Sequence, residues 1–296
     1  MRDDVFITEV LSKCEVLKRA NIWPGEPRMR PRLWLKNFEE NDRADAAILL
    51  DKFSFYSARQ SDALLVASFR SLGDGRPKSA VGQSRDELIA ALTRAVVTPV
   101  LGEDPDPTDS GNLLCRRARQ LVFHAQRSVA IEDALRHADA GEPVVFVDDF
   151  VGSGDQFLAT WRRELNGLSF EAAQRKSGFV AIYVALMGTD YGLKKISENA
   201  PSVAVSVTHV IEARSTLEGI APPGTMVGAK IGALLEKYSP RLTPREQYIA
   251  KNALYRKYGY KERKLLLAFD HSVPDATLPI FWSPGHSGWE PLIERT

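Results

Sequence analysis

Residues 143–157, PVVFVDDFVGSGDQF, give the clearest indication of the fold. Its apolar run Val144–Val147 predicts a short buried strand, and the DQFLATWRREL segment after it predicts a helix. Two adjacent carboxylates, Asp148 and Asp149, follow the apolar run. Ligands of open parallel sheets bind outside the carboxyl ends of the strands, near the switch in strand order. The stretch therefore predicts a ligand site at the end of a strand in an α/β sheet.

A glycine-rich turn, Gly152-Ser153-Gly154, follows the two aspartates and leads into the expected helix. Free backbone N–H groups and the positive end of a helix make such a turn a good cradle for phosphate. The carboxylates of Asp148 and Asp149 can bind ribose hydroxyls or a hydrated Mg²⁺ ion. Together these features predict a sugar-phosphate site, with phosphate in the turn and ribose over the aspartates.

Two other interpretations compete with the sugar-phosphate site. An apolar run followed by acidic residues also resembles the second acidic motif of P-loop ATPases, but the chain lacks the Gly-x-x-x-x-Gly-Lys-Ser/Thr motif that this class needs. The simpler alternative is a plain strand-turn-helix connection in which Asp155 is the N-cap of the helix. This structural alternative stays open.

Composition and charge narrow the class of protein. The chain has 296 residues, a formal net charge of +1 and two cysteines without a Cys-x-x-Cys pair, which argues against a disulfide framework and a zinc cluster. The charged N-terminus MRDDVFITEV does not resemble a signal peptide. The longest apolar run, Phe179–Met187, is shorter than the about 20 residues that span a bilayer. We expect a cytoplasmic protein that does not insert into a membrane.

Strand and helix patterns alternate from about Thr98 to Glu212. This alternation predicts an α/β fold with a doubly wound parallel sheet. The segment Gly178–Gly188 is apolar on both faces, as is typical at the centre of such a sheet. Strands are expected at residues 98–103, 143–150, 178–188 and 202–211, and helices at 112–126, 155–165 and 190–200.

The first 80 residues predict a helical extension, followed by an α/β domain over residues 81–296. The segment PRLWLKNF, from Pro31, predicts a short extended piece, and Ser84 to Glu87 form a capping-box pattern. The C-terminal residues 271–296, rich in proline, glycine and tryptophan, predict a structured loop. Further helices are expected at residues 5–20, 42–56, 61–72, 85–97, 229–237 and 244–257, and a strand at 264–270.

The segment Val144–Gln156 resembles the signature of type I phosphoribosyltransferases. That signature is four apolar residues, two acidic residues, three further residues, Thr/Ser-Gly, one residue and Thr. The resemblance implies a site for phosphoribosyl pyrophosphate and displacement at ribose C1, with Mg²⁺ on the pyrophosphate. It assigns the ribose, and an indirect contact to Mg²⁺, to Asp148 and Asp149. It assigns the phosphate to Gly152, Ser153 and Gly154.

Two positions depart from that signature. Gln156 replaces the final Thr and still offers amide donors to a phosphate. Asp155 stands where the family usually has a small neutral residue, and its carboxylate would repel a phosphate dianion. We therefore expect either a ligand with less charge at this point or a catalytic role for Asp155 beside Asp148 and Asp149.

A longer resemblance covers most of the chain. The blocks LWLKNF, LLDKF, TDSGNLLCRRAR, FVDDFVGSGDQF and LPIFW…PLIER, in this order, resemble divergent phosphoribosyltransferase-like proteins of bacterial conflict systems, some encoded beside retron reverse transcriptases. The resemblance implies an anti-phage effector with a type I phosphoribosyltransferase-like sheet, an N-terminal helical extension and a C-terminal hood. Such an effector would bind a ribose-phosphate or nucleotide and transfer or cleave at ribose C1. The alternative is a catalytically inactive fold that serves as a nucleotide-binding or nucleic-acid-binding regulatory subunit.

A second anion-binding element is expected at the start of the helix 112–126. In the phosphoribosyltransferase scheme a loop at this place holds pyrophosphate. Ser110 and Gly111 could do so through backbone N–H groups, with Arg116 facing the anion. The alternative is that Asp109 or Ser110 caps the helix and its arginines face solvent.

Residues 230–264 contain ten Lys or Arg against three Asp or Glu, and five of the eight tyrosines. Basic residues between aromatic ones suit single-stranded nucleic acid, so Lys257, Lys261 and Arg263 are candidate contacts for a nucleic acid or another partner. The alternative is two basic helices whose tyrosines pack on the sheet. The N-terminal helices could instead dock a reverse transcriptase, and a homo-oligomer is compatible with the sequence.

Aromatic and histidine side chains mark the C-terminal loop, which contains His271, Trp282, His286 and Trp289. Stackable rings could form a hood over a base or a nicotinamide ring. The alternative is that these rings close a small core.

Overall fold

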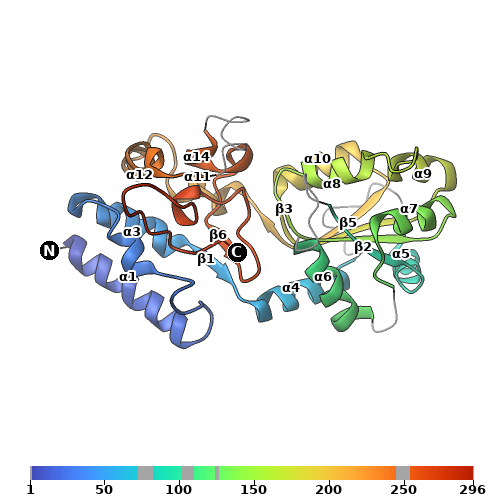
Figure 1. Cartoon of the computed structure of the whole chain (residues 1–296), viewed down its shortest axis with the longest axis horizontal. Helices are drawn as coiled ribbons and strands as arrows, with labels where there is room; N and C mark the ends of the chain where they lie inside the picture. The colour runs from blue at the N-terminus through green and yellow to red at the C-terminus, as the bar shows by residue number, and fades with distance from the viewer. Residues whose placement is uncertain (1, 73–82, 102–109, 124–126, 245–253, 296) are drawn as a thin grey trace. The chain divides into compact units, whose positions relative to one another are not determined.

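The computed structural model of the chain describes residues 2–72, 83–101, 110–123, 127–244 and 254–295 (Figure 1). The chain packs as two compact units: a terminal unit, Met1–Arg59 with Glu212–Thr296, and a central unit, Gln60–Ile211. This division differs from the predicted boundary at residue 80. The N-terminal helices belong with the C-terminal segment because a strand from each pairs in one small sheet.

Four parallel strands form the sheet of the central unit, in the order β2-β3-β4-β5. They are β2 (Val96–Pro99), β3 (Val144–Val151), β4 (Ala181–Thr189) and β5 (Val203–Ile211). The register aligns Val144 of β3 with Val96 on one side and with Ala181 on the other. The described strands follow the chain order without a reversal. The strand with the two aspartates is therefore an interior strand, as its apolar sequence predicts.

Four helices, α7 to α10, cover one face of this sheet. They are α7 (Ile131–Asp139), α8 (Asp155–Arg162), α9 (Phe170–Ser177) and α10 (Asp190–Asn199). Phe157 and Trp161 of α8 and Phe170 of α9 pack with Phe146 of β3 and Tyr183 of β4 in one buried cluster. Helices on one face follow from right-handed crossovers between parallel strands in sequential order.

Helix α4 (Ala58–Arg70) covers the opposite face of the sheet (Figure 1). The buried hydroxyl of Ser68 donates to the carbonyl of Ala185 at 2.8 Å and accepts from the amide of Thr208 at 2.9 Å. The unit also contains α5 (Arg85–Leu92), α6 (Ser110–Ala118) and the π-helical turn η2 (Arg119–Phe123). With a parallel sheet between helices on both faces, the predicted doubly wound α/β fold is confirmed.

Most predicted elements of the central unit are present with shifted bounds. The capping box is confirmed, since Glu87 N donates to Ser84 Oγ and Ser84 N donates to the Glu87 carboxylate at 2.7 Å. The predicted helix 85–97 is wrong beyond Leu92, because the buried segment Val96–Pro99 forms β2 instead. The patterns did not predict α7 and α9, which have only nine and eight residues.

The terminal unit joins the two ends of the chain. Strand β1 (Ser54–Tyr56) pairs in parallel with β6 (Leu267–Phe269), aligning Phe55 with Ala268. The other elements are α1 (Arg2–Arg19), α2 (Pro31–Leu35), η1 (Glu40–Asp42), α3 (Arg43–Lys52), η3 (Ala213–Ser215), α11 (Leu217–Ile220), α12 (Met226–Tyr238), η4 (Ser239–Arg241), α14 (Tyr255–Tyr258), η5 (Tyr260–Glu262) and η6 (Pro279–Phe281).

Two predicted elements of the terminal unit are wrong in part. The predicted helix 42–56 is wrong at its end, because Ser54–Tyr56 pair with β6 and place Phe55 in the core. The predicted extended segment from Pro31 is wrong at its start, where Pro31–Leu35 form α2 with proline in the favoured first turn. The predicted helix 244–257 lies mostly outside the described residues, and its described end falls in α14.

An aromatic core fills the terminal unit. The ring of Trp34 lies 4.9 Å from that of Phe38 and 5.5 Å from that of Phe281, between ring centroids. Phe38 in turn lies 5.7 Å from Trp289. Trp282 is buried in the same core. For both tryptophans of the C-terminal loop, the structure agrees with the alternative in which the rings close a core.

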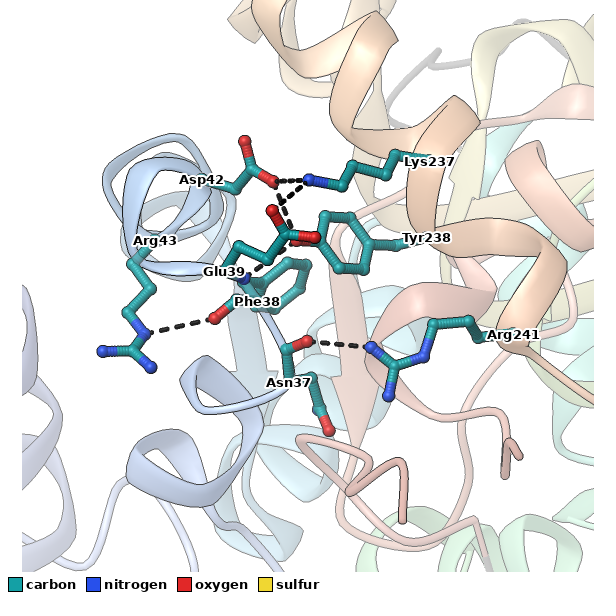
Figure 2. Close-up of polar contacts among 8 residues, drawn as sticks. All are labelled: Asn37, Phe38, Glu39, Asp42, Arg43, Lys237, Tyr238 and Arg241. Atoms are coloured by element: carbon teal, nitrogen blue, oxygen red, sulfur yellow. Dashed lines mark hydrogen bonds and ion pairs between the residues drawn. The ribbon is translucent and has the colours of Figure 1, made fainter. Parts of the chain in front are cut away.

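Polar contacts tie the N-terminal segment to α12 within this unit (Figure 2). Asp42 accepts hydrogen bonds from Lys237 Nζ at 2.8 Å and from the hydroxyl of Tyr238 at 2.7 Å. The same hydroxyl accepts from the backbone amide of Glu39 at 2.8 Å. The Lys237 ammonium and the Tyr238 hydroxyl lower the pKa of Asp42.

The described helices also bear on the expectation about membranes. None of them is long and apolar enough to cross a bilayer. The cytoplasmic location stays a prediction.

Candidate functional site

Strand β3 carries both aspartates within the interior of the central sheet. The strand continues to Val151, and Asp148 is in register with Ala185 of β4. Only 3% of Asp148 and 9% of Asp149 is exposed. The acidic pair is therefore largely buried, and Asp149 is the more exposed of the two.

Asp148 uses both of its carboxylate oxygens inside the protein. The hydroxyl of Tyr183 donates to Oδ2 at 2.9 Å, and the backbone amide of Asp149 donates to Oδ1 at 2.9 Å. Burial and the neighbouring charge of Asp149 raise the pKa of Asp148 well above its usual range. Burial and the charge of Asp148 also raise the pKa of Tyr183.

The turn Gly152–Gly154 packs closely against the start of α10. Gly154 has φ +79°, and a Cβ at this position would lie 2.8 Å from the carbonyl oxygen of Gly192, so glycine is required. Thr189 caps α10 by accepting from Gly192 N at 2.9 Å, and its hydroxyl donates to a carbonyl of the turn. In the described part of the chain, no residue accepts a hydrogen bond from the backbone amides of Ser153 and Gly154. Among the described residues, these two amides at the helix start thus have no hydrogen-bond acceptor.

Asp155 is the first residue of α8, and Gly154 is the N-cap. The alternative in which Asp155 caps the helix is therefore wrong, because its carboxylate is bonded elsewhere. Lys195 of α10 forms an ion pair with one carboxylate oxygen, and the Ser153 hydroxyl donates to the other at 2.8 Å. The Lys195 cation offsets the negative charge that was expected to repel a phosphate.

Helix α8 links the turn to the acidic pair. Its third residue, Phe157, stacks on Tyr183 with ring centroids 4.2 Å apart and an angle of 10° between the ring planes. Tyr183 also bonds Asp148, so one side chain contacts both the acidic pair and the helix that follows the turn. Gln156, in the first turn of α8, is exposed. The predicted set Asp148–Gln156 is thus brought together, while its contacts to a ligand stay a prediction.

The second candidate element, at the start of α6, lies beside the end of β2. Gly111 is buried, and a Cβ there would lie 3.0 Å from Pro99 Cβ and 3.2 Å from the carbonyl oxygen of Val100. Arg116 is exposed. The side chain of Ser110 and the loop before it lie outside the described residues. The pyrophosphate-binding role of these residues stays a prediction.

Helix α6 also approaches the acidic pair. The buried thiol of Cys115 has a pKa raised to about 12, first by burial and then by the charge of Asp148. In the structure, helix α6 packs against β3, the strand that carries the aspartates. The helix that begins with Ser110 and Gly111 therefore lies close to the aspartates.

The three basic candidates lie in the terminal unit, a different compact part of the chain from the aspartates. Lys257 forms an ion pair with Glu236 and lies 5.1 Å from the ring centroid of Tyr258. Lys261 is exposed, and Arg263 Nε donates to the Lys261 carbonyl at 2.9 Å. Lys257 thus already has an acidic and an aromatic partner within the protein. Contact of this segment with a nucleic acid stays a prediction.

The tyrosines of the basic segment pack mainly inside the terminal unit. Tyr238 and Tyr255 are buried, and Tyr258 and Tyr260 are partly buried against the same core. Tyr248 lies outside the described residues. The structure thus favours the alternative in which the tyrosines pack, although they pack on the terminal core.

Two residues of the candidate site, Tyr183 and Lys195, were not predicted. Tyr183 lies in the apolar run Phe179–Met187, which the pattern assigns to the core as a whole. Its hydroxyl, within a strand that is otherwise without polar side chains up to Met187, was the available signal. Lys195 gave no local signal, because its partner Asp155 belongs to another helix.

The side chains present at the site limit how it could bind Mg²⁺. Among the described residues, no group of three or more His, Cys, Asp or Glu side chains could hold a metal ion. Asp148 already accepts two hydrogen bonds. Mg²⁺ commonly binds through waters, one or two carboxylates and the phosphates of a substrate. These residues therefore fit a metal that arrives on the phosphates of a ligand, with Asp149 able to contact its water shell.

A comparison with known proteins identifies the family of the chain. The PRTase-CE family model matches residues 31–295. This match includes β3, the turn and α8, and it extends over parts of both compact units. No curated protein matches the chain. Because the family model covers most of its length, the chain belongs to the PRTase-CE family of phosphoribosyltransferase-like proteins.

Proposed function

We propose that the site at the end of β3 binds a ribose-phosphate or a nucleotide, and that the protein transfers or cleaves a group at ribose C1. The observation that carries this proposal is the acidic pair Asp148 and Asp149 next to a turn with two amides that bond no acceptor among the described residues. Carboxylates suit ribose hydroxyls, and amides at a helix start suit phosphate. Membership of a phosphoribosyltransferase-like family supports the same assignment.

The phosphate would lie at the turn before α8. The amides of Ser153 and Gly154 and the positive end of the helix favour an anion there. The side-chain amide of Gln156 is exposed in the same turn and can donate. Asp155 would oppose a phosphate, but its ion pair with Lys195 reduces the repulsion. A phosphate group therefore remains compatible with this turn.

The ribose would lie over the acidic pair. Displacement at ribose C1 breaks the bond to the leaving group, which departs with the electron pair, while the incoming nucleophile forms the new bond. The sugar ring carries positive, oxocarbenium-like charge in between. A carboxylate held in a buried site stabilises such charge more strongly than one in water. Asp149 suits this role, whereas Asp155 is engaged with Lys195.

Mg²⁺ would neutralise charge on the phosphates of the ligand when bound there. The chain's own residues would orient the ribose through the acidic pair and hold the phosphate through the amides of the turn. A dependence of ligand binding on Mg²⁺, measured by repeating a titration with a chelator present, tests this part of the proposal.

A role in defence against phage is a further part of the proposal. It is supported by the ordered blocks that resemble phosphoribosyltransferase-like proteins of bacterial conflict systems, including those beside retrons. The protein would act as the effector of such a system. Cells that carry the gene in its native neighbourhood should lose protection from phage when Asp149 is replaced by Asn. Protection that survives this replacement would count against the effector role.

The binding proposal is tested by calorimetric titration with phosphoribosyl pyrophosphate and Mg²⁺. The variant Asp148→Asn/Asp149→Asn removes the charge of the acidic pair and should weaken binding by about tenfold or more, since hydrogen bonds to charged groups contribute about 1.5–3 kcal/mol. The control Asp133→Asn/Asp139→Asn changes two partly exposed aspartates of α7 and should bind as the wild type does.

Full binding by the variant of the acidic pair would contradict the proposed site. Detection of released pyrophosphate then separates an enzyme from a binding protein. Release that depends on the acidic pair supports transfer at C1. Binding without release of pyrophosphate would support the alternative of a regulatory subunit with a phosphoribosyltransferase fold.

A further inference from the structure

Tyr183 of β4 connects the two parts of the proposed sugar-phosphate site. Building on that proposed function, we propose that Tyr183 is a positioning residue: through Asp148 it fixes the end of β3, so that Asp149 is the carboxylate that contacts the ribose. Asp148 would then bond only groups of the protein, and Asp149 would contact the ligand.

Asp148 is the internal member of the pair. Only 3% of the residue is exposed, and its two carboxylate oxygens accept from the Tyr183 hydroxyl and from the Asp149 amide, each at 2.9 Å. Each oxygen therefore already has one donor, and the burial of Asp148 leaves a ribose hydroxyl little access to the remaining lone pairs. The ligand is therefore expected to bond elsewhere.

Asp149 is held in place by its neighbour. Its backbone amide donates to Asp148, so the position of its main chain depends on where the Asp148 carboxyl lies. It is also the more exposed member of the pair. A shift of the Asp148 side chain would move Asp149 relative to the bound sugar. Small displacements of this kind weaken contacts that require a set geometry.

Tyr183 is well suited to fix Asp148. Its ring is buried and stacks on Phe157 of α8 at 4.2 Å, so packing sets the position of its hydroxyl. Phe157 lies in the first turn of the helix that begins at the phosphate-binding turn. The hydroxyl of Tyr183 therefore holds Asp148 of the acidic pair, and its ring packs on the helix that follows the proposed phosphate-binding turn. Replacing Tyr183 with Phe separates these effects, because it removes only the hydroxyl.

The experiment compares two probes, ribose 5-phosphate and inorganic phosphate, by calorimetric titration of the full-length protein. Inorganic phosphate reports the turn alone, and ribose 5-phosphate reports the turn and the acidic pair. The variants are Tyr183→Phe, Asp148→Asn and Asp149→Asn. The matched control is Tyr255→Phe, a buried tyrosine of the terminal unit whose hydroxyl bonds Asp275 at 3.3 Å.

We expect Asp149→Asn to weaken binding of ribose 5-phosphate by about tenfold or more, as for loss of a hydrogen bond to a charged group. Asp148→Asn should change it by less than about threefold, because the amide keeps an acceptor for Asp149 N and can still bond Tyr183. Tyr183→Phe should weaken it by about threefold to tenfold. None of the variants should change the affinity for inorganic phosphate, and Tyr255→Phe should change neither probe.

Several results would overturn the inference. Equal losses in Asp148→Asn and Asp149→Asn would make both aspartates ligand contacts. Unchanged binding of ribose 5-phosphate by Tyr183→Phe would remove the positioning role, and equal loss of both probes would make the tyrosine merely structural. These outcomes leave the sugar-phosphate site in place. Failure of the wild type to bind either probe would instead overturn the proposed function, and the inference with it.

Discussion

At the residue scale, the charge around Asp155 depends on Lys195. The sequence places Asp155 next to the turn proposed to bind phosphate, which predicts repulsion of a phosphate. In the structure the carboxylate forms an ion pair with Lys195 and accepts from the Ser153 hydroxyl. Lys195 and the Ser153 hydroxyl are also donors that a phosphate in the proposed site could use. In that site, Asp155 would therefore compete with the phosphate for these donors.

This competition leads to a prediction for Asp155→Asn. Loss of the carboxylate charge releases the Lys195 cation for a ligand, so the variant should bind inorganic phosphate about tenfold more tightly than the wild type. Calorimetric titration measures the effect. Asp133→Asn is a matched control, because Asp133 also lies in the first turn of a helix and forms an ion pair, with Arg136. Weaker phosphate binding by Asp155→Asn would contradict this account.

The conformation of Gly154 gives a second prediction at this scale. Alanine at Gly154 would adopt φ +79° and place its Cβ 2.8 Å from the carbonyl oxygen of Gly192. Gly154→Ala should lower the free energy of unfolding by roughly 2 kcal/mol or more. Gly167→Ala is the control, since Gly167 has φ +81° but no atom within 4 Å of a Cβ. It should cost only about 1 kcal/mol. Urea unfolding that gives equal losses would argue against the close contact.

At the element scale, hydroxyl groups fasten α4 to the sheet of the central unit. The Ser68 hydroxyl donates to the Ala185 carbonyl and accepts from the Thr208 amide, and Ser206 Oγ donates to the Ser68 carbonyl at 2.7 Å. Such small polar side chains allow a helix to approach a sheet closely while its polar groups stay bonded. The contact holds α4 against β4 and β5.

The prediction for this contact is a loss of stability in Ser68→Ala. The substitution leaves the Thr208 amide without its acceptor and the buried Ala185 carbonyl without its donor, and should lower the free energy of unfolding by about 1–3 kcal/mol. Ser12→Ala provides the control, because the Ser12 hydroxyl bonds its own helix in an exposed position. Its effect should stay within about 0.5 kcal/mol. Urea unfolding followed by circular dichroism measures both, and equal stability of the two variants would contradict the contact.

Elements with a strong local pattern could be predicted from the sequence. The apolar runs of β3, β4 and β5 and the periodic helices α8 and α10 are present near their predicted positions. Strand β1 could not be predicted in this way, because its three residues become a strand only by pairing with β6 at the other end of the chain. Helices α7 and α9 are too short for their periodicity to stand out.

Contacts between segments that are distant in sequence also limit how much of the site can be predicted. The stretch around Asp148, Asp149 and Gly154 carries its own signal, since carboxylates and glycines stand out after an apolar run. Tyr183 and Lys195 reach the site only through the fold, from the next strand and the helix after it. Their roles depend on the register of β4 against β3, which the sequence pattern does not provide.

At the scale of the whole molecule, the family match includes most of the N-terminal segment that the sequence pattern predicts as an extension. The match begins at residue 31 and ends at residue 295, so it includes α2, α3 and β1 as well as the central sheet. Only α1 precedes it among the described helices. The terminal unit is therefore largely part of what defines the family, and the segment predicted as an extension contributes to its core.

Stability of the terminal unit should depend on pH through Asp42. The Lys237 ammonium and the Tyr238 hydroxyl lower the pKa of Asp42 in the folded state. A lowered carboxylate pKa stabilises the fold above the unfolded pKa of about 3.9, and this stabilisation is lost as the pH falls through the folded pKa. Wild type should exceed Asp42→Asn in unfolding free energy at pH 7, and the difference should shrink below about pH 5.

Tryptophan fluorescence during urea unfolding can follow this difference. Four of the five tryptophans, Trp23, Trp34, Trp282 and Trp289, lie in the terminal unit. Asp3→Asn serves as the control, because Asp3 is exposed near the start of α1. A difference between wild type and Asp42→Asn that grows as the pH falls would contradict the ion-paired state of Asp42.

The most direct test of the sugar-phosphate site is a two-dimensional ¹H–¹⁵N NMR titration of the labelled protein with ribose 5-phosphate. We expect the largest shifts at the amides of Asp149, Ser153 and Gly154, with further shifts along the first turn of α8. A ligand at the end of β3 must perturb these groups because they surround it. Shifts confined to other parts of the chain, such as the basic residues near Lys257, or the absence of any shift, would contradict the central claim.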